Sequence, residues 1–117
     1  MAVKIGESGR MEIEGIIKRA EAAIYPYGDI RIATEFTLEG SEQEYVIERD
    51  LLRLDKGEKV RITYVSEFFQ DDNYGNKPDG PVIERRQVHI CDIVADGGGS
   101  KFIYFNHALL LGPQKGV

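Results

Sequence analysis

One long alternating segment constrains the fold more than any other part of this chain. Three leucines, Leu51, Leu52 and Leu54, lead into a turn-forming Asp-Lys-Gly-Glu segment at residues 55–58. Two sets of side chains then alternate: Val60, Ile62, Tyr64, Ser66 and Phe68 on one side, and Lys59, Arg61, Thr63, Val65, Glu67 and Phe69 on the other. A period of two is typical of a β-strand with one buried face and one solvent-facing face. The segment therefore predicts a small β-barrel or β-sandwich.

The composition is that of an ordinary soluble domain. The chain has 117 residues, 42% of them hydrophobic and 30% charged, and is long enough to bury a core as a single domain. We expect residues 1–9 to be an N-terminal extension and residues 106–117 a C-terminal tail. The formal net charge of −5 argues against a protein that coats nucleic acid through bulk charge, but it is compatible with a local basic patch.

Cysteine content and hydropathy favour the cytoplasm. Cys91 is the single cysteine of the sequence, which excludes an internal disulfide and favours a reducing compartment. The N-terminal segment lacks the apolar stretch of a secretory signal, and no segment reaches the length of a membrane span. We therefore expect a cytoplasmic protein that makes no contact with a membrane.

Similar alternation predicts strands along the rest of the chain. These cover residues 10–19, 29–38, 44–49, 58–69, 82–95 and 101–105. Val3 and Ile5 are compatible with a short additional edge strand before them. Gly15 predicts a bulge or a sharp bend within the first long strand, because glycine weakens a strand interior.

Turns and short connectors separate these strands. Residues 21–28 begin with a helix-forming composition, but a proline and a glycine end it within about a turn, so we expect a loop there. Residues 39–42 and 96–100 have the composition of hairpin turns. Residues 50–55 are expected to form a single helical turn, with Asp50 accepting hydrogen bonds from the backbone amides that follow it.

The order of these elements resembles the OB-fold. Three strands are followed by a short connector, the long strand at residues 58–69, a long polar loop and a last long strand. An OB-fold is a five-stranded barrel of this kind, usually with a helix between its third and fourth strands. The resemblance covers roughly residues 10–95 and implies an all-β, antiparallel barrel of five to six strands. An SH3-like barrel or a small sandwich is the alternative.

Aromatic and basic residues suggest a surface for single-stranded nucleic acid. OB-type barrels hold such strands by stacking bases on exposed rings, each worth roughly 1–3 kcal/mol, while arginines and lysines contact the phosphates. By this resemblance the candidate residues are Tyr25, Tyr27, Arg31, Lys59, Arg61, Phe69, Tyr74, Arg85 and Arg86. Single-stranded nucleic-acid binding is the leading specific hypothesis.

The alternative is that the same residues serve only the fold. The rings then cap the barrel, and the basic side chains pair with carboxylates on neighbouring strands. Outward parity supplies five such carboxylates: Glu12, Glu14, Glu35, Glu48 and Glu67. A face of mixed charge repels phosphates as well as attracting them, so this alternative remains open.

The polar loop at residues 70–81 is expected to be a recognition loop rather than a metal site. It is rich in Asp, Asn and Gly, as calcium loops are. No glutamate closes it at the required distance, and Lys77 adds a positive charge. We expect no metal and no cofactor, with Tyr74 as an anchor for a bound partner.

Catalysis has little support in the sequence. His89 lies two residues before Cys91 on an outward strand parity, but no third group is placed to orient a nucleophile. A lone cysteine in a strand is more often a small core residue. We therefore expect a binding module rather than an enzyme.

The C-terminal part suggests a protein partner or self-association. A strand can bury only about half of the side chains of residues 102–105 against one face. The remainder, followed by an apolar tail, forms the surface of an association site. The candidate residues are Phe102, Tyr104, Phe105, Leu109 and Leu110. A tail that folds across an open end of the barrel is the alternative, and an assembly module without nucleic acid is the alternative function.

Overall fold

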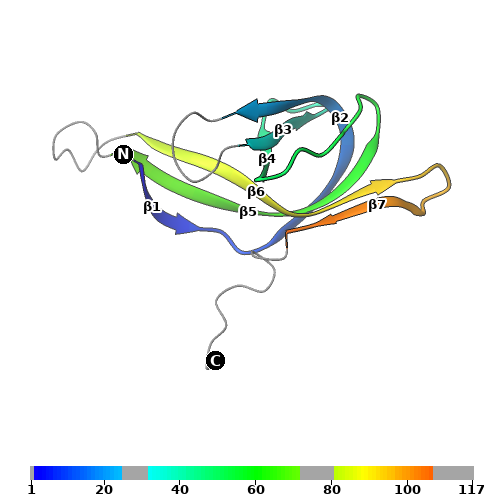
Figure 1. Ribbon diagram of the computed structural model, residues 1–117. Helices are drawn as coiled ribbons and strands as arrows, with labels where there is room; N and C mark the ends of the chain where they lie inside the picture. Colours follow the sequence, from blue (N-terminus) through cyan, green and yellow to red (C-terminus); the bar gives the residue numbers. More distant parts are fainter. Residues whose placement is uncertain (1, 25–31, 72–80, 107–117) are drawn as a thin grey trace, which may run out of the picture.

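The regular secondary structure in the described part of the chain consists of β-strands. The computed structural model describes residues 2–24, 32–71 and 81–106, which contain seven strands and no helix (Figure 1). The strands are β1 (Ala2–Glu7), β2 (Met11–Ile24), β3 (Ile32–Leu38), β4 (Glu44–Glu48), β5 (Lys59–Asp71), β6 (Val82–Val94) and β7 (Ser100–Phe105). The all-β prediction is confirmed, with one strand more than the upper limit expected.

Five of these strands form a closed ring. Their order is β5-β2-β3-β4-β6, and β6 pairs back onto β5. The order β5-β2-β3-β4 is a Greek key, in which the fourth strand returns to lie beside the first. Every pair is antiparallel except β4 and β6, which run parallel through Tyr45 opposite Arg86 and Val46 opposite Gln87. The expectation of a wholly antiparallel sheet is therefore wrong at this one contact.

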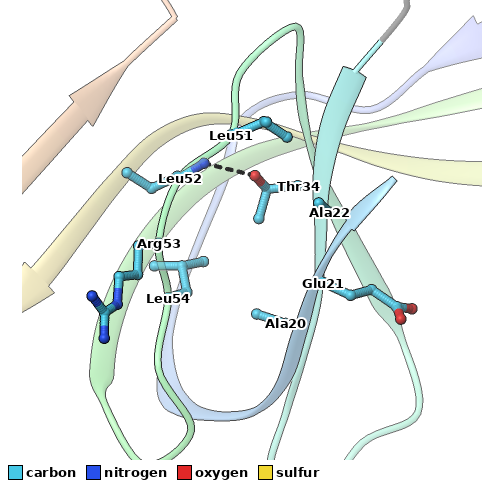
Figure 2. Close-up of a pocket in the computed structure, with 8 residues that line it drawn as sticks. All are labelled: Ala20, Glu21, Ala22, Thr34, Leu51, Leu52, Arg53 and Leu54. Carbon is cyan, nitrogen blue, oxygen red and sulfur yellow. Dashed lines mark hydrogen bonds between the residues drawn. The ribbon is translucent and has the colours of Figure 1, made fainter. Parts of the chain in front are cut away.

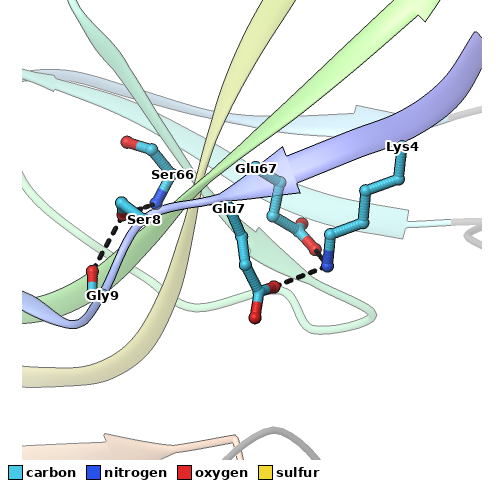
Figure 3. Close-up of polar contacts among 6 residues, drawn as sticks. All are labelled: Lys4, Glu7, Ser8, Gly9, Ser66 and Glu67. Carbon is cyan, nitrogen blue, oxygen red and sulfur yellow. Dashed lines mark hydrogen bonds and ion pairs between the residues drawn. The ribbon is translucent and has the colours of Figure 1, made fainter.

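Strands β5 and β6 form a long hairpin that extends past the ring, and β1 pairs with the projecting part of β5 (Figure 1). The edge strand expected around Val3 and Ile5 is thus confirmed as β1. Ser8 continues this pairing after β1 ends. Its amide donates to the carbonyl of Ser66 at 2.8 Å, and its Oγ accepts from the amide of Ser66 at 2.9 Å (Figure 3).

Strand β2 changes partners along its length. Met11–Ile16 pair with β5, whereas Ile17–Ile24 pair with β3. The predicted end at residue 19 and the loop from residue 21 are wrong, because β3 provides backbone partners as far as Ile24 and overrides a composition that favours a helix. Of the bulge or sharp bend predicted at Gly15, the bulge lies instead between Ile17 and Arg19.

The core lies inside the ring and draws on nearly every strand. Its buried members are Ile17, Phe36, Leu38, Tyr45, Ile47, Leu54, Val60, Ile62, Val88, Cys91, Ile93 and Tyr104. The rings of Phe36 and Tyr45 stack with 5.5 Å between their centres, and Tyr64 meets Tyr45 edge-on at 5.1 Å. Cys91 is a core residue as predicted, and burial raises the pKa of its thiol to about 12.

The connector between β4 and β5 is extended rather than helical. Thr34 holds it to β3. The Thr34 Oγ1 donates to the carbonyl of Asp50 at 3.0 Å. It also accepts from the amide of Leu52 at 2.8 Å (Figure 2). The helical turn predicted behind Asp50 is therefore wrong, since a buried threonine satisfies these backbone groups. The expected turn at residues 55–58 is confirmed, with the amide of Glu58 donating to the carbonyl of Asp55 at 3.1 Å and Gly57 at a φ of 91°.

Gly15 allows β2 to approach β3 closely where the strand changes partners. A Cβ atom at Gly15 would lie 2.9 Å from the Cδ1 and 3.3 Å from the Cβ of Leu38, a core residue. We expect Gly15→Val to lower the free energy of unfolding by about 1–3 kcal/mol through overpacking. Gly6→Val on β1, where a Cβ meets no atom within 4 Å, should change it by less than about 0.5 kcal/mol. Urea denaturation measures both, and equal effects of the two variants would contradict this role for Gly15.

Candidate functional site

A groove lies where β6 runs past the beginning of β4. Strand β4 pairs with β6 only at Arg86 and Gln87, so among the described residues the segment from Val82 to Arg85 has β5 on one edge and no strand on the other. The groove has a volume of about 370 Å³. It is lined by Glu35, Glu44, Val46, Phe69, Ile83, Glu84, Arg85 and Arg86.

The apolar part of the groove comes from the β5–β6 hairpin. Phe69 and Ile83 are opposite one another in the antiparallel ladder, so their side chains lie next to each other on one face. Phe69 is partly buried, and Ile83 is 52% exposed. Together they form the apolar surface of the groove.

The basic part of the groove is already engaged with carboxylates. A guanidinium nitrogen of Arg85 lies 3.2 Å from Glu48, and one of Arg86 lies 3.2 Å from Glu84. The guanidinium of Arg86 also lies 5.9 Å from the ring centre of Tyr45. Burial raises the pKa of the Glu48 carboxyl, and Arg85 opposes that shift. The structure thus brings together Phe69, Arg85 and Arg86, three of the predicted nucleic-acid residues.

Two other predicted residues lie elsewhere. Lys59 and Arg61 project from β5 towards β2, where Glu14 contacts them at 2.7 Å and 3.3 Å respectively. Arg61 also lies 3.7 Å from Asp92 on β6. These cross-strand ion pairs match the alternative in which basic side chains pair with carboxylates of neighbouring strands.

Several candidate residues lie outside the part of the chain that the structure describes. These are Tyr25, Tyr27, Arg31 and Tyr74 of the predicted nucleic-acid surface, and Leu109 and Leu110 of the predicted partner surface.

Strand β7 divides the remaining partner residues into two groups. Phe102 and Phe105 are 48% and 43% exposed, as is Ile103 between them at 43%. Tyr104 is only 8% exposed, because it lies opposite Cys91 in the ladder and packs in the core. Of the three partner residues on β7, Tyr104 is therefore the one that does not offer its side chain to the surface.

A row of charges continues from the groove to β1. Glu67 lies opposite Arg85 in the ladder, and its carboxylate is 3.0 Å from the ammonium of Lys4. The same ammonium lies 2.6 Å from Glu7 (Figure 3). These contacts raise the pKa of Lys4, chiefly through the hydrogen bond with Glu7. Within the described residues, no three His, Cys, Asp or Glu side chains are grouped as a metal site requires.

Sequence reasoning missed two residues of β6. Gln87 and His89 have outward parity, but they are only 1% and 8% exposed. The pairing moves from Thr63–Ile90 to Tyr64–Val88, which leaves His89 as an extra residue in β6. Both amide atoms of Gln87 and the Nδ1 of His89 are buried without a hydrogen-bond partner among the described residues. Alternation alone gives no signal for this bulge, because it arises from pairing with β5.

Burial lowers the pKa of His89, and Arg10 lowers it further while Glu67 and Glu7 act against the shift. The folded state therefore favours the neutral imidazole. The resulting stabilisation is complete above the ordinary pKa of 6.5 and is lost as the pH falls below it. We expect His89→Gln to lose less stability than the wild type between pH 7.5 and pH 5.5, in thermal melts. His107→Gln, which changes the second histidine, is the control, and identical pH profiles for wild type and His89→Gln would contradict the expectation.

Comparisons with known proteins found no match to this chain. No family model matches the chain, and neither the curated proteins nor the solved structures contain a significant match to it. In the part of the chain that the structure describes, no helix is long and apolar enough to cross a membrane.

Proposed function

We propose that this chain is an OB-like barrel that binds single-stranded nucleic acid as a non-enzymatic module. The ring order supports this architecture, because an OB-fold is a five-stranded Greek-key barrel whose strand face and loops bind oligonucleotides. The connector between β4 and β5 also supports it. In the sequence this connector stands between the third and fourth strands of the ring, where such barrels usually carry a helix. Its Leu54 is buried in the core.

One observation carries the proposed function. An exposed apolar surface made by Phe69 and Ile83 shares one groove with two arginines, Arg85 and Arg86. In this proposal a base stacks on the ring of Phe69, and the two arginines of the groove pair with the phosphates next to that base. Stacking is tolerant of sequence because every base has a flat face.

The carboxylates of the groove set the expected strength of binding. Glu48 and Glu84 hold the two arginines, so a phosphate has to displace each carboxylate before it can pair. With two phosphate contacts, the slope of log K against log salt is roughly −1.4 for a single strand. The proposed module therefore binds weakly and with a shallow salt dependence.

Fluorescence anisotropy with a labelled single-stranded oligonucleotide tests this proposal. We expect binding at low salt, with Phe69→Ala losing about 1–3 kcal/mol of affinity through lost stacking. Arg86→Gln should weaken binding and flatten the salt slope by roughly 0.7. Arg61→Gln is the matched control, because Arg61 lies outside the groove and is paired with Glu14. No binding at low salt, or an equal loss in Arg61→Gln, would reject the groove as the site.

A second candidate function is self-association through β7. This strand pairs with β6 on one edge, and within the described residues no strand pairs with its other edge. Phe102, Ile103 and Phe105 expose apolar side chains along it, and Lys101 is its one charged residue. Edge strands of this kind pair with a second copy unless charges or a cover prevent it.

Sedimentation velocity across a range of protein concentrations tests self-association. A β7 interface predicts a dimer that dissociates in the double variant Phe102→Ser, Ile103→Thr, because the apolar contact is removed. Ile5→Thr on β1 is the control, since Ile5 is similarly exposed on the opposite edge of the sheet. A monomer at every concentration would reject this second function and leave the nucleic-acid proposal standing.

A further inference from the structure

We propose that Gln87 recognises an adenine base of the bound strand, which gives the groove a preference among single-stranded sequences. This inference rests on the proposed function, since it needs a strand in the groove. The stacking and phosphate contacts of the proposed function do not distinguish one base from another. Gln87 would add a contact that does.

The position of Gln87 places it beside residues of the groove. It pairs with Val46 of β4 on one side and with Val65 of β5 on the other, so it shares the outer face of the sheet with them. Val46 lines the groove, as does Arg85, which lies two residues before Gln87 on the same face of β6. Gln87 does not itself line the groove, so its side chain lies buried on the same face of the sheet as two residues that do.

The state of the Gln87 amide is the second observation. Its side chain is 1% exposed, and neither the Nε2 nor the Oε1 has a hydrogen-bond partner among the described residues. A buried amide without partners destabilises the folded protein. A ligand that offers one donor and one acceptor side by side satisfies both atoms and removes that penalty.

In the proposed mode of binding, Arg85 controls access to this amide. It lies two residues before Gln87 on the same face of β6 and is held to Glu48 at 3.2 Å. A phosphate in the groove competes with Glu48 for the guanidinium, and the movement of Arg85 opens access to Gln87. Phosphate binding and base recognition are thus consecutive steps at neighbouring positions on one strand.

The surrounding charges select adenine. Glu35 is opposite Val46, Glu67 is opposite Arg85, and Glu48 contacts Arg85, so three carboxylates lie on the face of the sheet that carries Gln87. A carboxylate repels the carbonyl oxygens of guanine, cytosine, thymine and uracil. Adenine is the one standard base without a carbonyl oxygen. Its N6 amino group donates to the glutamine Oε1 while its N7 accepts from the Nε2, which is the usual bidentate pairing of glutamine with adenine.

Base preference in two variants tests the inference. Labelled oligodeoxyadenylate, oligodeoxycytidylate and oligodeoxythymidylate of equal length are titrated by anisotropy at low salt. We expect the wild type to bind the adenine strand on the order of tenfold more tightly than the others. Gln87→Leu should reduce this preference to less than about twofold while melting no lower than the wild type, because it removes an unpaired buried amide.

Thr37→Val is the matched control. Thr37 also carries a buried, unpartnered oxygen on the outer face of the ring, but it lies on β3 and does not line the groove. It should keep the adenine preference of the wild type. If Gln87→Leu keeps the adenine preference of the wild type, Gln87 is not the cause of that preference and the inference is overturned.

The remaining outcomes separate this inference from the function on which it rests. Equal binding of all three strands by the wild type overturns adenine recognition and leaves the proposed function intact. No binding of any strand overturns both. Adenosine monophosphate is the competitor that distinguishes a free nucleotide from a strand: displacement of the oligonucleotide at equal concentration would overturn recognition within a strand.

Discussion

The partner change of β2 is the constraint on which the rest of the structure depends. One strand pairs with β5 through its first half and with β3 through its second, so it must bend sharply in between. The close approach of Gly15 to Leu38 and the register shift after Ile17 occur at that bend. Without the bend, β2 and β3 would continue the β5 sheet in one plane, and β4 could not reach β6 to close the ring.

The groove is a consequence of how the ring closes. Strand β4 has five residues and β6 has thirteen, and their parallel contact spans only two pairs. The first part of β6 therefore runs with β5 past the beginning of β4, and among the described residues no strand pairs with its free edge. Closure of the core and opening of the candidate site are two results of the same mismatch in strand length.

Alternation in the sequence predicted the strands well because it reports local burial. It located β3, β4, β5 and β6 to within a few residues, along with the turn at residues 55–58. It failed where a distant partner decides the structure. β3 extends β2 to Ile24, Thr34 holds the connector extended, and pairing with β5 inserts His89 as a bulge. For the candidate site, parity grouped Lys59 and Arg61 with Phe69, whereas strand curvature and cross-strand ion pairs separate them.

The electrostatics of the groove argue that phosphate contacts alone cannot select a ligand. Each arginine already has a carboxylate partner, and the whole chain carries a net charge of −5, so long-range attraction of a polyanion is weak. When a phosphate replaces a carboxylate as the partner of an arginine, the free energy of binding changes little, since one ion pair replaces another. Any net affinity must then come from groups whose partners are missing in the free protein. Two such groups are the apolar surface of Phe69 and Ile83 in the groove and, on the same face of β6, the Gln87 amide, which has no hydrogen-bond partner among the described residues. A site of this kind is expected to discriminate by the base rather than by the backbone.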